Sequence, residues 1–458
     1  MTSSTRFERA VDALDQRTGV ARVLALALRK VFPDHWSFLL GEVALFAFVI
    51  LVATGTFLTF FYVPSTARVI YDGSYVPLQG QEVSAAFDSV LDLSFTVRAG
   101  LLMRQIHHWT ALLFVAVIVA HLCRVFFTGA FRRPRELNWL LGVAVLTLAL
   151  ASGVTGYTLP DDLLSGTGAR IAYTAILSIP FAGPYLAFLL FAGEFPTDAL
   201  ISRFFVLHIM ILPALIAVLL TAHIGLIVLQ KHTQYRGGAA REDNVVGRYL
   251  WPGQAFTSVA LFFLTAAIVA LLGGLFQINP VWLYGPFDAT QVSSPAQPDW
   301  YVGWLDGALR LFPPWEIHIG GIVIPAPFIP AILIPGIVFT FVALWPFIEA
   351  FVTDDHAEHN LLDSVVDHPA RTATGLATLA YFLVLTIAGA NDVIARVLHV
   401  DVGSLTALLQ VAVIAVPIGT WLIAYRLASI LRARPSDQGT SGPRAIVRGP
   451  MGGFEEEE

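Results

Sequence analysis

Four histidines lie in the apolar part of this 458-residue chain, at two similar spacings. His107 and His121 are separated by fourteen positions, and His208 and His223 by fifteen. At 100° per residue each pair shares one helix face, and at 1.5 Å per residue its members stand about 21 to 22 Å apart along the axis. Ionisable side chains within a membrane are costly and usually functional. The spacing therefore indicates two chemically useful levels on each of two helices.

The two histidine segments are expected to run in the same direction through the membrane. His107 then lies at the depth of His208, and His121 lies at the depth of His223. A neutral imidazole is a good axial ligand for haem iron. A lone membrane histidine more often bonds to a neighbouring helix, but four at matched depths favour two haem sites with two histidines each. His108, about 100° around the helix from His107, is expected to be structural or near the rim.

Two glycine pairs repeat this spacing on two other segments. Gly41 and Gly55 are separated by fourteen positions, and so are Gly142 and Gly156. A haem edge needs room against a helix backbone, and glycine provides it, although small residues also serve ordinary helix packing. The two glycine pairs and the two histidine pairs together predict a four-helix bundle that holds two stacked haems.

Two arginines and the one cysteine complete the residues of chemical interest in this region. Arg104 and Arg124 flank the first histidine segment and are candidate partners of haem propionates; ordinary interfacial arginines are the alternative. Cys123 is the one cysteine. A single cysteine excludes an internal disulfide, a CxxCH haem site and a cysteine-ligated iron–sulfur cluster within this sequence. Cys123 is expected to be a small packed residue.

The elements that must position these residues are membrane helices. The chain is 56% hydrophobic and only 13% charged, whereas a soluble chain is about a quarter charged. Apolar blocks of about 20 residues predict transmembrane helices. The expected class is an all-α integral membrane protein with eight spans, of which the first four form the di-haem bundle: roughly 38–63, 105–127, 138–158, 204–230, 255–277, 326–350, 372–390 and 405–430.

Four regions are expected along the chain. They are an N-terminal segment (1–36), a di-haem domain of four spans (37–253), a second domain of four spans (254–433) and a disordered Gly/Pro/Ser-rich tail that ends in four glutamates (434–458). Two long stretches lie between spans, 159–202 and 278–325. Loops of this length are usually functional or disordered, and short surface helices are expected in the first.

The distribution of positive charge predicts the orientation in the membrane. Most of the 27 lysine and arginine residues fall on the side that holds both termini and the segments 124–135 and 231–248. Because cytoplasmic loops carry an excess of these residues, both termini are expected in the cytoplasm of a multi-pass cell-membrane protein. The stretches 159–202 and 278–325 then face outward.

Several motifs resemble cytochrome b of the cytochrome bc family, the quinol:cytochrome c oxidoreductases, over about residues 30–430. They are the histidine and glycine pairs, "RRPRELNWLLGV", "GYTLP", "RFFVLHIMILP" and "PDWYVGWLDGALRLFPPWE", and the last looks most like the actinobacterial branch. The resemblance implies two non-covalent haem b groups. The outer, low-potential haem would be held by His107 and His208, and the inner, high-potential haem by His121 and His223.

The resemblance also implies two quinone sites. The outer, quinol-oxidising site would include the segment around Asp299 and Tyr301. Most members of the family have a glutamate at the position of Asp299, and the shorter aspartate leaves its reach in question, so that Tyr301 is expected to share its role as proton acceptor. For the inner, quinone-reducing site the match is poorer, and the candidates are His232, Lys231, Asp243 and Trp36.

The mechanism that the resemblance implies is a proton-translocating Q cycle of the translocase class. One electron of the quinol, with menaquinol expected, goes to a Rieske iron–sulfur subunit and on to a c-type cytochrome subunit. The other crosses the membrane through both haems to the inner quinone site. A homodimer, a supercomplex with a terminal cytochrome c oxidase and contact with membrane lipids are expected, and no nucleic-acid partner is.

Two other classes of protein compete with this interpretation. A two-haem membrane anchor of another quinone-linked enzyme would explain the histidines but not "PDWY" or the last three spans. A secondary transporter using histidines for proton coupling would predict broken helices and structural repeats. A second histidine group, near residues 356–368, is either a metal or proton-entry patch or a solvated loop.

Overall fold

Eight helices long and apolar enough to cross a membrane dominate the computed structural model. The structure describes residues 15–19, 28–291, 297–433, 446–448 and 454–456. Within these residues the spans are Trp36–Thr59, Gly100–Phe127, Glu136–Thr158, Leu200–Gln230, Leu250–Leu275, Ile329–Thr353, Pro369–Gly389 and Val402–Ala433. The predicted class and all eight predicted spans are confirmed, with ends that differ by a few residues. Most of the N-terminal segment before residue 28 and most of the expected disordered tail lie outside the described residues.

The spans are built from regular helices with short π or 3₁₀ turns at some ends. Their elements are η1 (Trp36–Phe38) with α3 (Leu39–Thr59), α5 (Gly100–Phe127), α6 (Glu136–Thr158), α9 (Leu200–Val206) with η3 (Leu207–Ile211) and α10 (Leu212–Gln230), η4 (Leu250–Gln254) with α11 (Ala255–Leu275), η5 (Ile329–Leu333) with α14 (Ile334–Thr353), α15 (Pro369–Gly389) and α17 (Val402–Ala433). Within lipid a helix satisfies its own backbone polar groups, which is why apolar runs of this length take this form.

Shorter elements connect the spans. The helices are η2 (Val76–Leu78), α4 (Ala85–Phe95), α7 (Leu163–Leu177), α8 (Gly183–Phe191), α12 (Val281–Tyr284), α13 (Trp300–Leu311) and α16 (Asn391–Leu398). The strands are β1 (Val31–Phe32), β2 (Arg68–Ile70), β3 (Glu82–Ser84), β4 (Arg248–Tyr249), β5 (Ile317–Ile319), β6 (Ile322–Ile324), β7 (Ile446–Arg448) and β8 (Phe454–Glu456). They pair as antiparallel two-stranded sheets, β1 with β4, β2 with β3, β5 with β6, and β7 with β8. The expected surface helices after "GYTLP" are α7 and α8.

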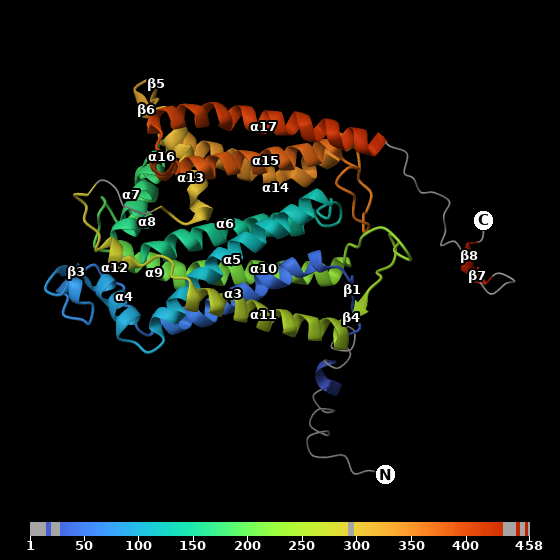
Figure 1. The fold of residues 1–458 in the computed structure, drawn as a ribbon, viewed down its shortest axis with the longest axis horizontal. Helices are drawn as coiled ribbons and strands as arrows, with labels where there is room; N and C mark the ends of the chain where they lie inside the picture. The colour runs from blue at the N-terminus through green and yellow to red at the C-terminus, as the bar shows by residue number, and fades with distance from the viewer. Residues whose placement is uncertain (1–14, 20–27, 292–296, 434–445, 449–453, 457–458) are drawn as a thin grey trace, which may run out of the picture.

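The spans form two groups that lie one above the other in Figure 1. Helices α3, α5, α6 and α10 make up the first, with α11 against α5, and α14, α15 and α17 make up the second, with the shorter α13 against α15. The end of the molecule that carries α4, α7, α8 and α12, at the left of Figure 1, is called here the α7 end. The opposite end, where β1 and β4 lie, is called the β1 end.

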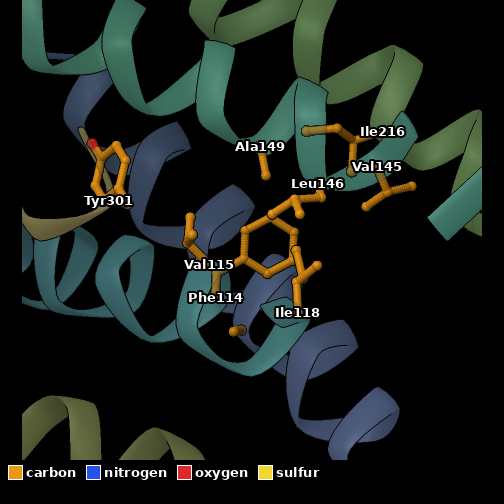
Figure 2. Packing of buried hydrophobic residues seen from close by; sticks show 9 residues of the cluster. Phe114, Val115, Ile118, Val145, Leu146, Ala149, Ile216 and Tyr301 are labelled. Carbon is orange, nitrogen blue, oxygen red and sulfur yellow. The ribbon is translucent and has the colours of Figure 1, made fainter. Parts of the chain in front are cut away.

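An apolar cluster fills the middle of the first group. It contains Phe114 and Ile118 of α5, Leu146 and Ala149 of α6, and Ile216 of α10, and Figure 2 shows these side chains converging between the ribbons. Phe114 is halfway between His107 and His121 in sequence. The cluster therefore separates the two histidine levels with close-packed hydrocarbon.

Candidate functional site

The structure brings the four predicted histidines together as two cross-helix pairs. The rings of His107 on α5 and His208 in η3 have centroids 6.1 Å apart, with an angle of 72° between their planes. The rings of His121 on α5 and His223 on α10 have centroids 6.4 Å apart, with an angle of 71°. The two pairs thus share one ring spacing and one relative orientation at two levels.

This ring spacing suits a metal ion between each pair. An ion midway between centroids 6.1 Å apart would lie about 3 Å from each centre and, because a ring nitrogen lies about 1 Å nearer, about 2 Å from each facing nitrogen. That is the length of a metal–imidazole bond. The residues present therefore fit a haem iron with two axial histidines.

Hydrogen bonds hold the Nδ1 atom of three of the four rings, those of His107, His208 and His223. The Nδ1 of His208 lies 2.9 Å from the Ser152 carbonyl oxygen, and the Nδ1 of His223 lies 3.1 Å from that of Asn138. A carbonyl accepts only, so both Nδ1 atoms donate and both Nε2 atoms are left with a free lone pair. The Nδ1 of His107 lies 3.0 Å from the hydroxyl oxygen of Thr54. This is the arrangement by which proteins orient a metal-binding imidazole.

A π turn explains the unequal spacing of the two histidine pairs. His208 lies in the π turn η3, in which the Leu212 N–H donates to the Leu207 carbonyl five residues earlier. Such a turn holds one more residue than an α-helical turn does. Pro213, directly after it, has no N–H to donate. The extra residue between His208 and His223 is thus absorbed locally, and the two rings stay opposite those of α5.

Each predicted glycine lies against one of the four rings. A Cβ on Gly55 would stand 3.1 Å from the His107 ring, and one on Gly41 would stand 3.3 Å from the His121 ring. On α6, a Cβ on Gly142 would meet the His223 ring at 3.8 Å, whereas one on Gly156 would overlap the His208 ring. The glycines therefore make room for the imidazoles themselves as well as for a flat group beside them.

The two predicted arginines are buried with unsatisfied nitrogen atoms. The Nε and Nη2 of Arg124 have no hydrogen-bond partner, and its guanidinium lies 4.2 Å from the centre of the Phe38 ring. Arg104 donates from Nη2 to the Asn279 carbonyl at 2.7 Å, but its Nε has no partner. A buried cation without an anionic partner is costly. Both sites are therefore suited to an acidic group of a bound molecule, as a propionate would be.

Asp299 and Tyr301 lie at the α7 end, beside the His107 level. Asp299 is the residue before α13, and its carboxylate oxygens lie 2.9 and 3.0 Å from the Nε2 of His108. Tyr301 is buried against α6, where a Cβ on Gly153 would stand 2.7 Å from its ring. Gly153 is one turn from Gly156, which contacts His208, so α6 joins the two sites. Burial, followed by the charge and hydrogen bond of Asp299, raises the pKa of the Tyr301 hydroxyl well above its usual value.

His108 is the residue of this site that sequence reasoning missed. His108 is part of this site rather than a residue near the rim, because its Nε2 lies 2.9 Å from the Asp299 carboxylate. Its position about 100° from a ligand candidate on the same helix was the available signal, since it directs the side chain to a different neighbour.

The inner candidates differ in accessibility at the β1 end. The His232 ring packs against Phe32 at 4.4 Å, and its buried Nε2 has no partner. Burial, followed by the charges of Lys30, Arg135 and Arg124, lowers its pKa to about 4. Lys231 donates from Nζ to the Asp243 carbonyl at 3.2 Å, and Trp36 is 70% exposed. His232 is thus the candidate whose free nitrogen is enclosed.

The second histidine group forms separate pairs. His359 lies 2.9 Å from Asp355, His356 lies 3.5 Å from Asp354, and His368 lies 3.2 Å from Asp363. No cluster of three or more potential metal ligands from histidine, cysteine and acidic side chains occurs in the part of the chain that the structure describes.

Comparisons with known proteins agree with this architecture. The family model described as "Cytochrome b(N-terminal)/b6/petB" matches residues 112–286. The chain is 45% identical over 450 residues to the cytochrome bc1 complex cytochrome b subunit of Streptomyces coelicolor, covering 98% of this chain and 82% of that protein. It is 47% identical over 419 residues to the subunit of the same name from Mycobacterium tuberculosis, covering 91% and 76%.

A solved structure shares the fold. "Hyperthermophilic respiratory Complex III" superposes with a TM-score of 0.66 at 20% identity, covering 91% of this chain and 99% of that one. The relatives at 43 to 47% identity span most of the chain, and membership of their family implies haem b and an integral membrane location. The chain belongs to the family of cytochrome b subunits of the cytochrome bc1 complex.

Proposed function

We propose that this chain oxidises quinol at the α7 end and reduces quinone at the β1 end of a quinol:cytochrome c reductase, as part of a proton-translocating Q cycle. The observation that carries the proposal is that a carboxylate paired with His108 lies directly beside the His107–His208 pair. A proton acceptor thus lies beside a histidine pair that can hold an electron carrier. The second histidine pair lies at the other level of the bundle.

Two haem b groups would be held by the histidine pairs. His107 and His208 would bind the outer, low-potential haem, and His121 and His223 would bind the inner, high-potential haem. When bound, a haem supplies one-electron transfer across the apolar middle of the bundle. The chain holds the imidazoles at a fixed spacing, and it offers the guanidinium groups of Arg104 and Arg124 to the propionates.

Quinol oxidation is assigned to Asp299 and its neighbours. A quinol hydroxyl loses its proton as its electrons leave, and Asp299 is the base that accepts this proton. Tyr301 has a raised pKa, so it stays protonated and donates a hydrogen bond. Tyr301 is therefore assigned as a hydrogen-bond donor, and the expectation that it shares the role of proton acceptor is less favoured. The two electrons of the quinol divide between a Rieske iron–sulfur partner and the haem pair.

Quinone reduction is assigned to His232 and its neighbours at the β1 end. With a pKa lowered to about 4, the imidazole is neutral near pH 7 and can bond to a quinone oxygen through its free Nε2. Lys231, Asp243 and Trp36 lie nearby in sequence or at the same end and are assigned to the rim of this site. Protons would enter here from the cytoplasm, where both termini would lie.

The proposed partners follow from the same chemistry. The named relatives are subunits of a cytochrome bc1 complex, and an electron that leaves quinol outward needs an acceptor there. A Rieske subunit, a c-type cytochrome subunit, a homodimer of the complex and a supercomplex with a terminal oxidase are therefore proposed. Menaquinol is the proposed substrate.

A redox titration of the purified complex tests the two-haem assignment. Two b-type signals with separated midpoint potentials are expected in reduced-minus-oxidised spectra. The His208→Ala variant is expected to lose the low-potential signal and keep the other. Loss of the high-potential signal instead would reverse the pairing, and a wild-type complex with no b-type haem would favour a transporter.

Quinol oxidation is tested with Asp299→Asn. This variant is expected to keep both haem signals and to lower turnover by about 10²-fold or more, the usual worth of a general base. Asp306→Asn is the matched control, because Asp306 lies on α13, which Asp299 directly precedes, but pairs with Arg310 at 2.8 Å. Equal turnover in the two variants would reject Asp299 as the base, and a wild type that binds haem but oxidises no quinol would favour a membrane anchor of another enzyme.

A further inference from the structure

The segment that carries Asp299 is bonded to the second group of spans through Gln297. The Nε2 of Gln297 donates to both carboxylate oxygens of Asp392, at 3.1 and 3.2 Å. Its Oε1 accepts from the Nη2 of Arg310 at 3.5 Å. An amide turned the other way would place its N–H groups beside an arginine and its oxygen beside a carboxylate, so the two partners fix its orientation. These three side chains are called here the Gln297 clamp.

Further bonds hold the clamp in place. Arg310 of α13 donates from Nη1 to Asp392 at 3.0 Å and to the side-chain oxygen of Asn391 at 2.8 Å. Asn391, the first residue of α16, is buried and donates to the hydroxyl of Thr406 in α17 at 2.9 Å. Asp392 is 51% exposed, and an ion pair at the surface adds little to the stability of a fold. What the clamp provides is therefore a defined position for Gln297.

The connection between the clamp and Asp299 is short and stiff. Pro298 is the one residue between Gln297 and Asp299. The proline ring fixes its own φ near about −65°, and it confines the residue before it to extended conformations. Few backbone torsions are therefore free to absorb a movement of Gln297, and such a movement would displace Asp299 as well.

Helix α13 fixes the other side of Asp299. The Asp299 carbonyl accepts from the N–H groups of Val302 at 2.9 Å and Gly303 at 3.2 Å, in the first turn of the helix. A Cβ on Gly389 of α15 would stand 2.3 Å from the Gly303 carbonyl oxygen. The backbones of α13 and α15 are thus in direct contact, and this contact sets the position of the helix that Asp299 precedes.

We infer that Gln297 is a positioning residue for Asp299. This inference rests on the proposed quinol oxidation. Gln297, held by Arg310 and Asp392, fixes the backbone before Asp299, and α13 fixes the backbone after it. The Asp299 carboxylate then meets His108 of the first group of spans at 2.9 and 3.0 Å. A short side chain reaches a given point only where its backbone is held close to that point, so an aspartate here depends on the clamp.

The first test is Gln297→Glu, in the purified complex with menadiol as the quinol and cytochrome c as the final acceptor. The variant keeps the size of the side chain but places a carboxylate oxygen against Asp392, which repels it. It is expected to lower kcat about tenfold or more, because a displacement of about 1 Å at a reacting group costs about 10²-fold. KM and both haem signals should be unchanged. The double variant Gln297→Glu/Asp392→Asn again sets a donor opposite an acceptor, and it should recover most of the lost kcat.

A double-mutant cycle separates positioning from a general disturbance of the fold. If Gln297 acts through Asp299, Gln297→Glu lowers kcat no further in a chain that already carries Asp299→Asn. Gln291→Glu is the matched control, because it makes the same exchange at an exposed residue of the same connecting segment, and it should keep the wild-type kcat. Asp306→Asn also leaves the clamp in place, because Asp306 accepts from the Nε of Arg310 at 2.8 Å and asparagine accepts that bond too.

Three outcomes overturn the inference: a wild-type kcat in Gln297→Glu, an equal loss in Gln291→Glu, and a further fall of the same size in the Asp299→Asn background. Should Gln297→Glu fail to assemble, Gln297→Ala takes its place in the same cycle, because it removes both bonds of the amide without adding a charge. Wild-type turnover in Asp299→Asn would contradict the proposed function, and the inference with it. The variant that keeps its rate therefore shows which of the two has failed.

Discussion

At the scale of single residues, the space beside each imidazole decides whether a haem can be held. Gly156 and Gly142 are on the same helix and face His208 and His223, but a Cβ has ordinary contact distance, 3.8 Å, only at Gly142. Gly156→Ala is therefore expected to displace His208 and to deplete the low-potential haem signal, at a packing cost of about 1 to 3 kcal/mol. Gly142→Ala should keep both signals. The measurement is the haem content per complex, taken from the reduced-minus-oxidised spectrum of each variant. Equal haem loss in both variants would show that the contact between glycine and ring does not determine haem binding.

The pairing of His108 with Asp299 gives a second residue-level prediction. Asp299 precedes α13 without capping it, so its carboxylate is free to meet His108 and takes its direction from that contact. His108→Leu is expected to lower quinol turnover by about 10²-fold, because misplacing a reacting group by about 1 Å costs this much. His108→Gln, which retains an N–H donor, should recover most of it.

The measurement for His108 is kcat and KM with the haem spectrum taken in parallel, since His107 is the adjacent residue. A lowered kcat with both haem signals intact supports positioning of Asp299. Matching turnover in the leucine and glutamine variants would show that the hydrogen bond has no part in the reaction.

At the scale of elements, sequence periodicity predicted the helices and the pairing of the histidines. It did not predict the π turn that keeps the rings of each pair opposite one another. The two histidine spacings could be recognised in the sequence, and so could the glycines that face the rings. The π turn at His208 could not, because whether Pro213 kinks a helix or widens one turn depends on the neighbouring helix. His108 was missed for a related reason: its role arises from Asp299, far away in the sequence.

A buried ion-pair network joins the two groups of spans at the β1 end. Arg371 of α15 contacts Glu349 of α14 and lies 2.9 Å from Asp363, which also lies 3.0 Å from both Arg132 and Arg236. Arg371 is almost fully buried, whereas Arg236 is largely exposed. Arg371→Met leaves the largely buried Glu349 carboxylate without its arginine and is expected to cost about 3 to 5 kcal/mol. Arg236→Met should cost under about 1 kcal/mol. Thermal unfolding of the detergent-solubilised complex compares the stability of the two variants. Equal stability would contradict a larger contribution of Arg371 to the network.

The same network gives a direction for the effect of pH. Burial alone would raise the pKa of Asp363, but hydrogen bonds from His368 and Arg371 and the charge of Arg132 hold it well below its usual range. A group with a lowered folded-state pKa stabilises the fold above its unfolded pKa, about 3.9 for aspartate, and this contribution is lost as the pH falls toward the folded value. Thermal stability is therefore expected to drop below about pH 4 in the wild type, and to drop less in Asp363→Asn, which lacks the titrating group.

At the scale of the whole molecule, charge asymmetry and the position of the site bear on one question, the side from which protons leave. The proposed base Asp299 lies at the α7 end, and the lysine- and arginine-rich segments 124–135 and 231–248 lie toward the β1 end. The excess of lysine and arginine predicts that the basic end faces the cytoplasm, and in that orientation quinol protons would be released outward. A fluorescent protein fused after Ala433 is therefore expected to mature in cells, and a secreted phosphatase fused at the same position should be inactive. The same phosphatase inserted at Gly320, in the turn between β5 and β6, should be active. The reverse pattern would place quinol oxidation on the cytoplasmic side. Electrons would then pass through the two histidine pairs from the cytoplasmic side to the outer side, and this path could not support outward release of the quinol protons.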